Sequence, residues 1–178
     1  PLLILDDDVH EQFVRDLTAQ ISESKAPWLA LAAHHPIETI GSHSYWRFFG
    51  RFNKNDYASS ANKKYRALVR RTIQNAKRPV QVFLTGHDHS LKFIHDHDKE
   101  QYFPDYHIVS GAGGKISYVH SVSASKWGKA VPGFVVMEID TERPNVLVLR
   151  YMDSNQKKQI RKFEIKIDPF ELAPTEAH

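Results

Sequence analysis

The spacing of apolar residues changes along the chain from a helical to a strand-like period. Apolar residues recur every four positions between residues 13 and 21, which predicts an amphipathic helix over 8–24. A second helix is expected over 60–77, and Pro79 ends its helical pattern. The side chains expected to face inward are Phe13, Leu17 and Ile21 on the first helix, and Tyr65, Leu68, Val69, Ile73 and Ala76 on the second.

Apolar runs, which are typical of buried strands, occupy 2–5 and 28–33, and a further strand is expected over 80–85, before Gly86. From residue 91 onward the pattern becomes strand-like. The strands expected there cover 91–94, 106–110, 134–139, 146–151 and 160–167. Short polar connections join the last three of these strands, so a meander is expected. Residues 37–59 show no period, and a loop of that length is uncommon unless it has a function.

The order of the elements indicates an α/β fold. Strands and helices alternate as far as residue 85 and only strands follow, which predicts a layered sheet with flanking helices. One domain is expected over 1–168, and 169–178 is expected to be a tail. The chain opens on Pro1 and a buried-type strand, without a methionine or the basic segment of a signal peptide, so a fragment or a processed product is expected.

Composition narrows the class of protein. The 178 residues are 41% hydrophobic and 25% charged, which is typical of a globular domain and excludes a disordered chain. No apolar run approaches the length of a membrane span. Cysteine is absent, so disulfides and thiolate metal sites are excluded. The formal charge of +3 is too small to indicate a polyanion partner, and nucleic acid is not expected to bind.

The first candidate site is the segment Gly86-His87-Asp88-His89, which directly follows the strand over 80–85. A glycine at a strand end permits a sharp turn, and two histidines two residues apart can then point toward one site. Neutral imidazole is a ligand for Zn, Fe, Mn or Ni. Asp88 could hydrogen-bond one of the two histidines or be a solvated turn residue. A polar turn with surface histidines is the alternative, because two histidines do not define a metal site.

A second histidine pair, in His34-His35-Pro36, also follows an apolar strand. Ligands of α/β sheets bind outside the carboxyl ends of strands, so both histidine pairs are expected at one sheet edge. Pro36 favours an extended conformation at His35. Either histidine of this pair, taken alone, is equally well explained as a hydrogen-bonded loop residue. Together with the later turn, the pair predicts that His34, His87 and His89 converge.

The two histidine motifs resemble those of the calcineurin-like metallophosphoesterases, and more closely those of the purple and tartrate-resistant acid phosphatases. In that branch one buried strand ends in His-x-Pro and a later strand ends in Gly-His-x-His. The likeness extends over about residues 2–140 and includes the segment 106–114. The resemblance implies a four-layer α/β/β/α sandwich, of which this chain would be the C-terminal half.

The resemblance also implies a phosphoester hydrolase with two divalent or trivalent metal ions, drawn from Fe, Zn and Mn. His34 and His87 would bind one ion and His89 the other. His43, nine residues after the first ligand, would be the catalytic histidine that contacts the phosphate or the leaving group. His35 falls on the residue between histidine and proline, so it would lie near the ligands or the substrate without binding metal. Two metals would hold the phosphate oxygens and lower the pKa of a bound water.

Several motifs of the family are absent from the chain. Neither Gly-Asp nor Gly-Asn occurs, so the bridging aspartate, an asparagine ligand and an oxyanion histidine would lie in a missing N-terminal half of the same domain. Asp8-Val9-His10 matches the family's Asp-x-His by letters, but it begins a helix and is not expected to bind metal. The isolated chain is therefore expected to be an incomplete enzyme.

Weaker features leave an alternative function open, that of a non-catalytic domain that binds metal or a polyanion. Seven basic residues and no acidic one lie between Asp56 and Asp88, which usually marks a solvated helix face. The glycine-rich segment 110–114 could approach a phosphate, although a plain turn is favoured. The sequence indicates no compartment, and the resemblance favours an extracytoplasmic or secreted protein. The histidines expected at the surface or in loops are His95, His97, His107 and His120.

Overall fold

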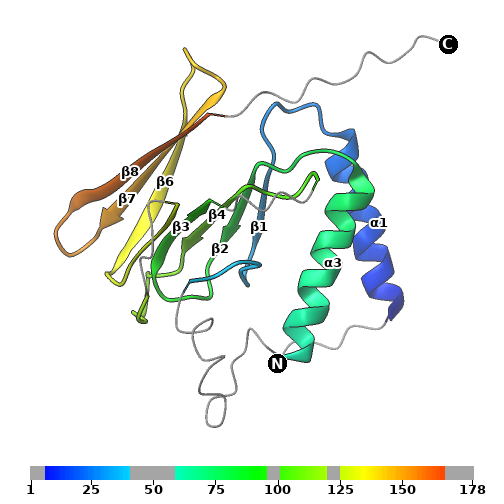
Figure 1. Cartoon of the computed structure of the whole chain (residues 1–178), viewed down its shortest axis with the longest axis horizontal. Coiled ribbons are helices and arrows are strands. Elements are labelled where there is room, and N and C mark those ends of the chain that lie inside the picture. Colours follow the sequence, from blue (N-terminus) through cyan, green and yellow to red (C-terminus); the bar gives the residue numbers. More distant parts are fainter. Residues whose placement is uncertain (1–6, 41–58, 96–100, 120–124, 167–178) are drawn as a thin grey trace.

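Two helices and two sheets form three layers in the part of the chain that the computed structural model describes, residues 7–40, 59–95, 101–119 and 125–166 (Figure 1). Both helices cover one face of a five-stranded sheet, and a three-stranded sheet covers the other face. The expected α/β class, a layered sheet with flanking helices, is confirmed. The expected strand over 2–5 and the tail over 169–178 lie outside the described residues. Neither described helix is long and apolar enough to cross a membrane.

The two helices begin and end close to where the sequence predicts. α1 spans Asp7–Glu23 and α3 spans Ser60–Ala76. The Ser59 hydroxyl caps α3 by accepting a hydrogen bond from the amide of Asn62 at 3.1 Å. α3 stops at Lys77, which takes a left-handed conformation with φ of 51°.

The buried faces of the helices follow the predicted period, with one exception. α3 buries Val69 and Ile73 against the sheet, as expected. On α1 the buried residues are Val14 and Ile21, whereas Phe13 is 45% exposed, so the prediction for Phe13 is wrong. Val14 precedes Ile21 by almost two full turns, which places the two side chains on one stripe, and Phe13 is rotated away from it.

The five-stranded sheet determines which strand ends meet. Its strands are β1 Ala30–Ala33, β2 Val82–Thr85, β3 Leu91–His95, β4 Tyr106–Ser110 and β5 Lys126–Lys129. Their order in space is β1-β2-β4-β3-β5. β1, β2 and β4 run parallel, β3 runs antiparallel to β4, and β5 runs antiparallel to β3 and so in the direction of β4. The carboxyl ends of β1, β2 and β4 therefore lie side by side at one edge of the sheet.

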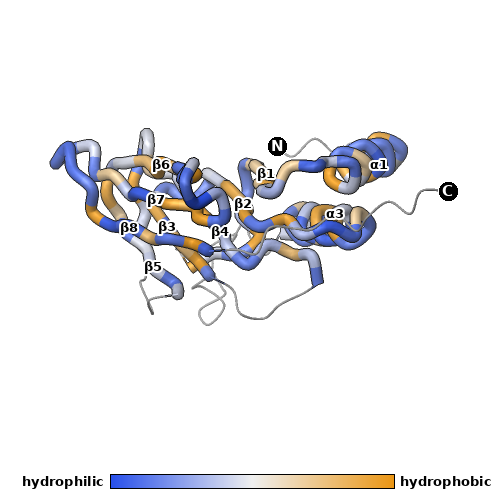
Figure 2. Tube along the Cα trace, turned by 90° about the horizontal axis from the view of Figure 1, so that it is seen from above, coloured by the Kyte–Doolittle hydropathy of each residue, from blue (hydrophilic) through white to orange (hydrophobic). Residues whose placement is uncertain are grey.

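The second sheet is the predicted meander of β6 Gly133–Ile139, β7 Val146–Asp153 and β8 Lys158–Lys166. Its inner face packs on the first sheet through one apolar core. The largest fully buried side chain there, Tyr151, donates a hydrogen bond to the carbonyl of Lys92 at 2.7 Å. Figure 2 shows apolar positions gathered on the central strands and mixed with polar positions along both helices. Burial raises the pKa of Tyr151 well above its usual range, so this phenol remains a neutral donor.

Two features of the first sheet differ from the sequence expectation. β5 is not predicted, because its four residues show no apolar alternation, and its pairing with β3 defines it instead. The run over 28–33 was expected to be fully buried, but Ala30 and Ala32 are exposed. β1 lies at the sheet edge, while the second sheet contacts the first at β3 and β4, so one face of β1 remains outside the core.

Candidate metal centre

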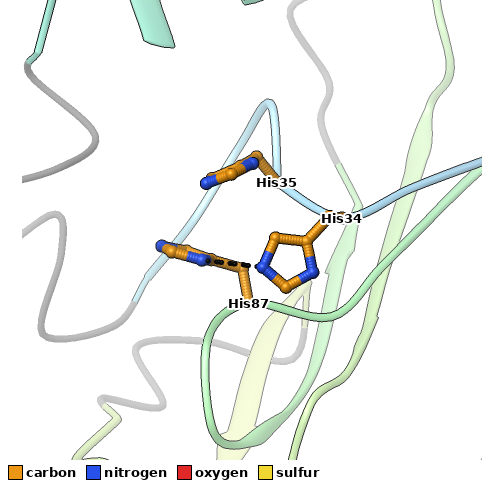
Figure 3. Close-up of side chains that lie close together, drawn as sticks. All are labelled: His34, His35 and His87. Atoms are coloured by element: carbon orange, nitrogen blue, oxygen red, sulfur yellow. Dashed lines mark hydrogen bonds between the residues drawn. The ribbon is translucent and has the colours of Figure 1, made fainter. Parts of the chain in front are cut away.

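Two neighbouring parallel strands deliver three histidines to the same edge of the sheet. Ala33 ends β1 and Thr85 ends β2, and these two residues are paired in register. His34 and His35 follow β1 directly, and His87 lies two residues beyond β2. Figure 3 shows the three rings gathered where the two segments leave the sheet.

The three rings lie at distances that suit a shared metal ion. His87 Nδ1 lies 3.2 Å from His34 Nε2, and one of these nitrogens donates to the other when no ion is bound. The ring centroids of His35 and His87 are 4.2 Å apart, and one nitrogen from each of the three rings falls within 4.8 Å of the others. Two nitrogens bound to one tetrahedral zinc ion at about 2.0–2.1 Å lie about 3.3 Å apart. The His34–His87 pair therefore already has the separation that a zinc ion requires.

The composition of this group differs from the expected ligand set. The structure brings His34 and His87 together and adds His35, which was not expected to bind metal, as a third ring. His89, expected on the other ion, is not part of this group. The carbonyl of His89 accepts a hydrogen bond from the Ser117 amide at 2.7 Å, which ties that residue to the loop after β4. His43 lies outside the described residues. Spacing alone cannot identify the third ring, because a turn sends successive side chains in different directions.

The turn over 86–90 is shaped by the path from β2 to β3. β4 lies between these two strands, so the chain must cross over the carboxyl end of β4. The amides of Asp88 and Ser90 each donate to the carbonyl two residues earlier, at 2.6 Å, which folds the turn tightly. His87, not Gly86, takes the left-handed conformation, with φ of 55°. The expectation that Gly86 supplies the conformational freedom is wrong, since a Cβ there would have no neighbour within 4 Å.

Gly111, which directly follows β4, is the glycine that this crossing requires. A Cβ at Gly111 would overlap the backbone carbonyl of Asp88 and lie 3.2 Å from the carbonyl carbon of Gly86. The Gly111 amide donates to the carbonyl of Ser90 at 3.2 Å. The first glycine of the segment 110–114 therefore makes room for the histidine turn.

Gly111→Ala should displace the turn that carries His87. We expect the free energy of unfolding to fall by about 1–3 kcal/mol, the usual cost of overpacking, and zinc binding to weaken. Chemical denaturation and a zinc titration measure the two effects. Gly113→Ala is the matched control, because a Cβ there meets nothing within 4 Å. If both variants behave like the wild type, the close approach at Gly111 does not determine the position of the turn.

A buried ion pair lies directly behind the histidines. The Asp88 carboxylate accepts hydrogen bonds from the Lys92 ammonium and the Thr39 hydroxyl, and Lys92 also donates to the Thr39 oxygen at 2.9 Å. Asp88 is 2% exposed and Lys92 is fully buried, so the alternative of a solvated turn aspartate is wrong. Burial lowers the pKa of Lys92, and the adjacent Asp88 carboxylate opposes that shift.

The backbone at His35 is tied to α3. The Tyr65 hydroxyl donates to the carbonyl of His35 at 3.1 Å. Burial raises the pKa of Tyr65 to about 12, so the phenol remains a neutral donor over the physiological range. This bond anchors the segment after β1 to the helical layer.

One histidine expected at the surface is buried instead. His107 on the central strand β4 is 2% exposed and packs near the rings of Phe83 and Phe103. The sequence prediction is wrong here because a central strand covered on both faces buries its middle residues, His107 to Val109, whatever their polarity. His95 is half-buried and stacks on Tyr106 at a centroid distance of 4.5 Å. His97 and His120 lie outside the described residues.

The basic run over 63–78, on α3 and just beyond its end, is exposed only in part. Arg78 is 2% exposed and donates a hydrogen bond to the carbonyl of Ala26. Arg71 pairs with Glu11 at 2.7 Å, and Arg70 lies 3.5 Å from Glu38. Lys63, Lys64 and Lys77 remain exposed, so the run is in part the solvated face that was expected.

The chain is similar to purple acid phosphatases in both sequence and structure. It is 26% identical over 102 residues to purple acid phosphatase 17 of Arabidopsis thaliana, and 27% identical over 103 residues to purple acid phosphatase 7 of the same plant. Each alignment covers 57% of this chain and 24% of the relative, so the matched region spans about a quarter of those proteins. No protein-family model matches the chain.

Solved structures show the same fold. Purple acid phosphatase PPD1 from yellow lupin (Lupinus luteus) seeds superposes with a TM-score of 0.55 at 18% identity, over 88% of this chain and 28% of that one. PhoD gives a TM-score of 0.54 at 13% identity, over 87% of this chain and 31% of the other. The resemblance read from the two histidine motifs is thereby confirmed.

Proposed function

Starting from this resemblance, we propose that the chain forms part of the metal site of a phosphoester hydrolase of the purple acid phosphatase type. The observation that carries the proposal is the 3.2 Å separation of His34 Nε2 and His87 Nδ1 at the carboxyl ends of two parallel strands. In this proposal the chain is the C-terminal half of a domain that holds two metal ions, drawn from Fe, Zn and Mn. Such ions supply a bound water of lowered pKa and neutralise charge on phosphate oxygens.

Each histidine has a distinct role in the proposal. His34 and His87 hold one ion through neutral ring nitrogens, and His89 binds the other. His35 adds a third nitrogen beside the first ion, where it contacts the ion or a phosphate oxygen. His43 protonates the leaving oxygen or stabilises its charge. The remaining ligands come from the N-terminal half of the same domain, and an extracytoplasmic location is part of the proposal.

The proposal predicts that the 178-residue chain binds a metal ion but is a poor catalyst. Zinc should bind through the histidine group, which isothermal calorimetry measures. Hydrolysis of an aryl phosphate should be weak or absent, because three histidines without a bridging carboxylate cannot hold two ions at a short spacing. Adding the upstream half of the domain should increase turnover. Robust metal-dependent turnover by the chain alone would show that its site is complete, and absent zinc binding would remove the metal role.

The non-catalytic alternative gives a different result in the same experiment. A domain that only binds metal should take up zinc and remain inactive when the upstream half is supplied. The distinction therefore depends on turnover by the two halves together and not on metal binding.

A further inference from the structure

We propose that Asp88 and Lys92, which are buried, and Thr39, which is half-buried, form a clamp that positions His34 and His87 against each other. Thr39 lies in the segment that follows β1, Asp88 lies in the turn after β2, and Lys92 lies on β3. Lys92 and Thr39 are then positioning residues that act on the ligands without touching the ion. The effect of the clamp on metal binding rests on the proposed function. The effect of the clamp on the position of the two rings does not.

The register of β3 explains how a lysine comes to lie under the turn. Leu91 and Phe93 belong to the core between the two sheets. Successive residues of a strand point to opposite faces, so Lys92 extends toward the helical layer and the histidine edge. Its ammonium there meets the carboxylate of Asp88, and both side chains are almost completely buried. The sequence spacing of four residues thus connects the strand to the middle of the histidine turn.

Thr39 closes the clamp between the two histidine segments. Its hydroxyl donates to the carboxylate of Asp88 and accepts from Lys92 at 2.9 Å, so the donor and acceptor capacities of this group are both used. Thr39 belongs to the segment that begins with His34 and His35, and Asp88 adjoins His87. One hydroxyl therefore links the two segments whose rings must converge.

Stability alone does not account for this arrangement. Well-packed apolar residues of similar volume can replace a buried ion pair at no cost or with a gain in stability. Hydrogen bonds between charged groups have fixed directions, so they hold the attached segments in a defined geometry. A metal site needs such a geometry, and apolar packing does not supply it. Partners behind metal ligands typically change metal affinity by about 10–100-fold when they are mutated.

Thr39→Val tests the clamp, because it removes the hydroxyl at nearly constant shape and leaves the Asp88–Lys92 pair in place. In the metal-free chain, nuclear Overhauser effects between the rings of His34 and His87 should weaken. The dissociation constant for zinc should rise by about tenfold, at the lower end of the usual range. Thr39→Ser retains the hydroxyl and should restore both measurements. Thr39→Ala provides a second variant without the hydroxyl if the valine variant does not fold.

Thr72→Val is the matched control for loss of a threonine hydroxyl. Thr72 is buried in α3, and its hydroxyl donates to the carbonyl of Leu68 at 2.9 Å, away from the histidines. This variant should leave ring contacts and zinc affinity unchanged. Wild-type behaviour of both hydroxyl-free Thr39 variants, or equal losses in Thr72→Val, would overturn the clamp. If the wild-type chain binds no zinc, the metal role of the site is wrong. The nuclear Overhauser effects between the rings then test the clamp without the zinc measurement.

Discussion

In the complete hydrolase that we propose, replacing His87 with alanine should remove metal, whereas replacing His43 should leave the metal bound and slow turnover. His87 supplies a ring nitrogen 3.2 Å from that of His34, so its loss removes one of the two ligands proposed for the first ion. We expect the metal dissociation constant to rise by more than about 100-fold, beyond the range for residues behind the ligands. His43→Ala should lower turnover by about 10- to 10⁴-fold, the range for losing a general acid or an oxyanion donor.

Metal content by atomic emission and turnover of an aryl phosphate separate these two roles. His10→Ala is the control, since His10 lies in the first turn of α1 and is not assigned to the site. Loss of metal from the His43 variant, as from the His87 variant, would make His43 a ligand. Unchanged metal and turnover in the His43 variant would remove the catalytic role that the resemblance implies.

Lys92→Met should strongly destabilise the fold. Methionine removes the ammonium, so the buried Asp88 carboxylate loses its ion-pair partner. Of the clamp residues, Thr39 then still donates a hydrogen bond to that carboxylate. Breaking a buried ion pair by removing one partner costs about 3–5 kcal/mol. For a domain of this size, a loss of 1 kcal/mol lowers the melting temperature by about 2–4 °C, so a decrease of about 6–20 °C is expected. Calorimetry and urea denaturation measure the change.

Two further variants test the cause of that loss. Lys129→Met on the neighbouring strand β5 replaces an exposed lysine and should change stability by no more than about 0.5 kcal/mol. Adding Asp88→Asn to Lys92→Met removes the buried charge, so the double variant should lose less stability than the sum of the two single variants. Strict additivity would show that the two side chains do not depend on each other.

Local patterns predicted the elements of the fold well. The boundaries of β4 were predicted without error, and those of α1 and α3 to within one residue, because their apolar periods are long and well defined. β5 was missed, since a short strand at a sheet edge is defined by its partner and not by its own residues. The exposure of Ala30 likewise depends on how far the second sheet extends over the first. The residues around Ala30 in the sequence do not indicate that extent.

The candidate site was predictable only in part. Strand ends carrying histidine in a parallel sheet were enough to bring His34 and His87 together. The presence of His35 as a third ring beside this pair depends on turn geometry, which the sequence spacing does not show. The roles of Gly111 and Lys92 depend on the insertion of β4 between β2 and β3, which is a property of the topology.

The separation of the two histidine segments along the chain has a consequence for protein synthesis. His87 follows His34 by 53 residues, and the parallel pair β1–β2 must close that long loop, whereas the meander β6–β7–β8 pairs through short connections. At translation rates of about 5–20 residues per second, β1 emerges about 3–10 s before the strand that completes the His34–His87 pair. During that interval His34 lacks the ring of His87 beside it, so the His34–His87 pair can form only after β2 has paired with β1.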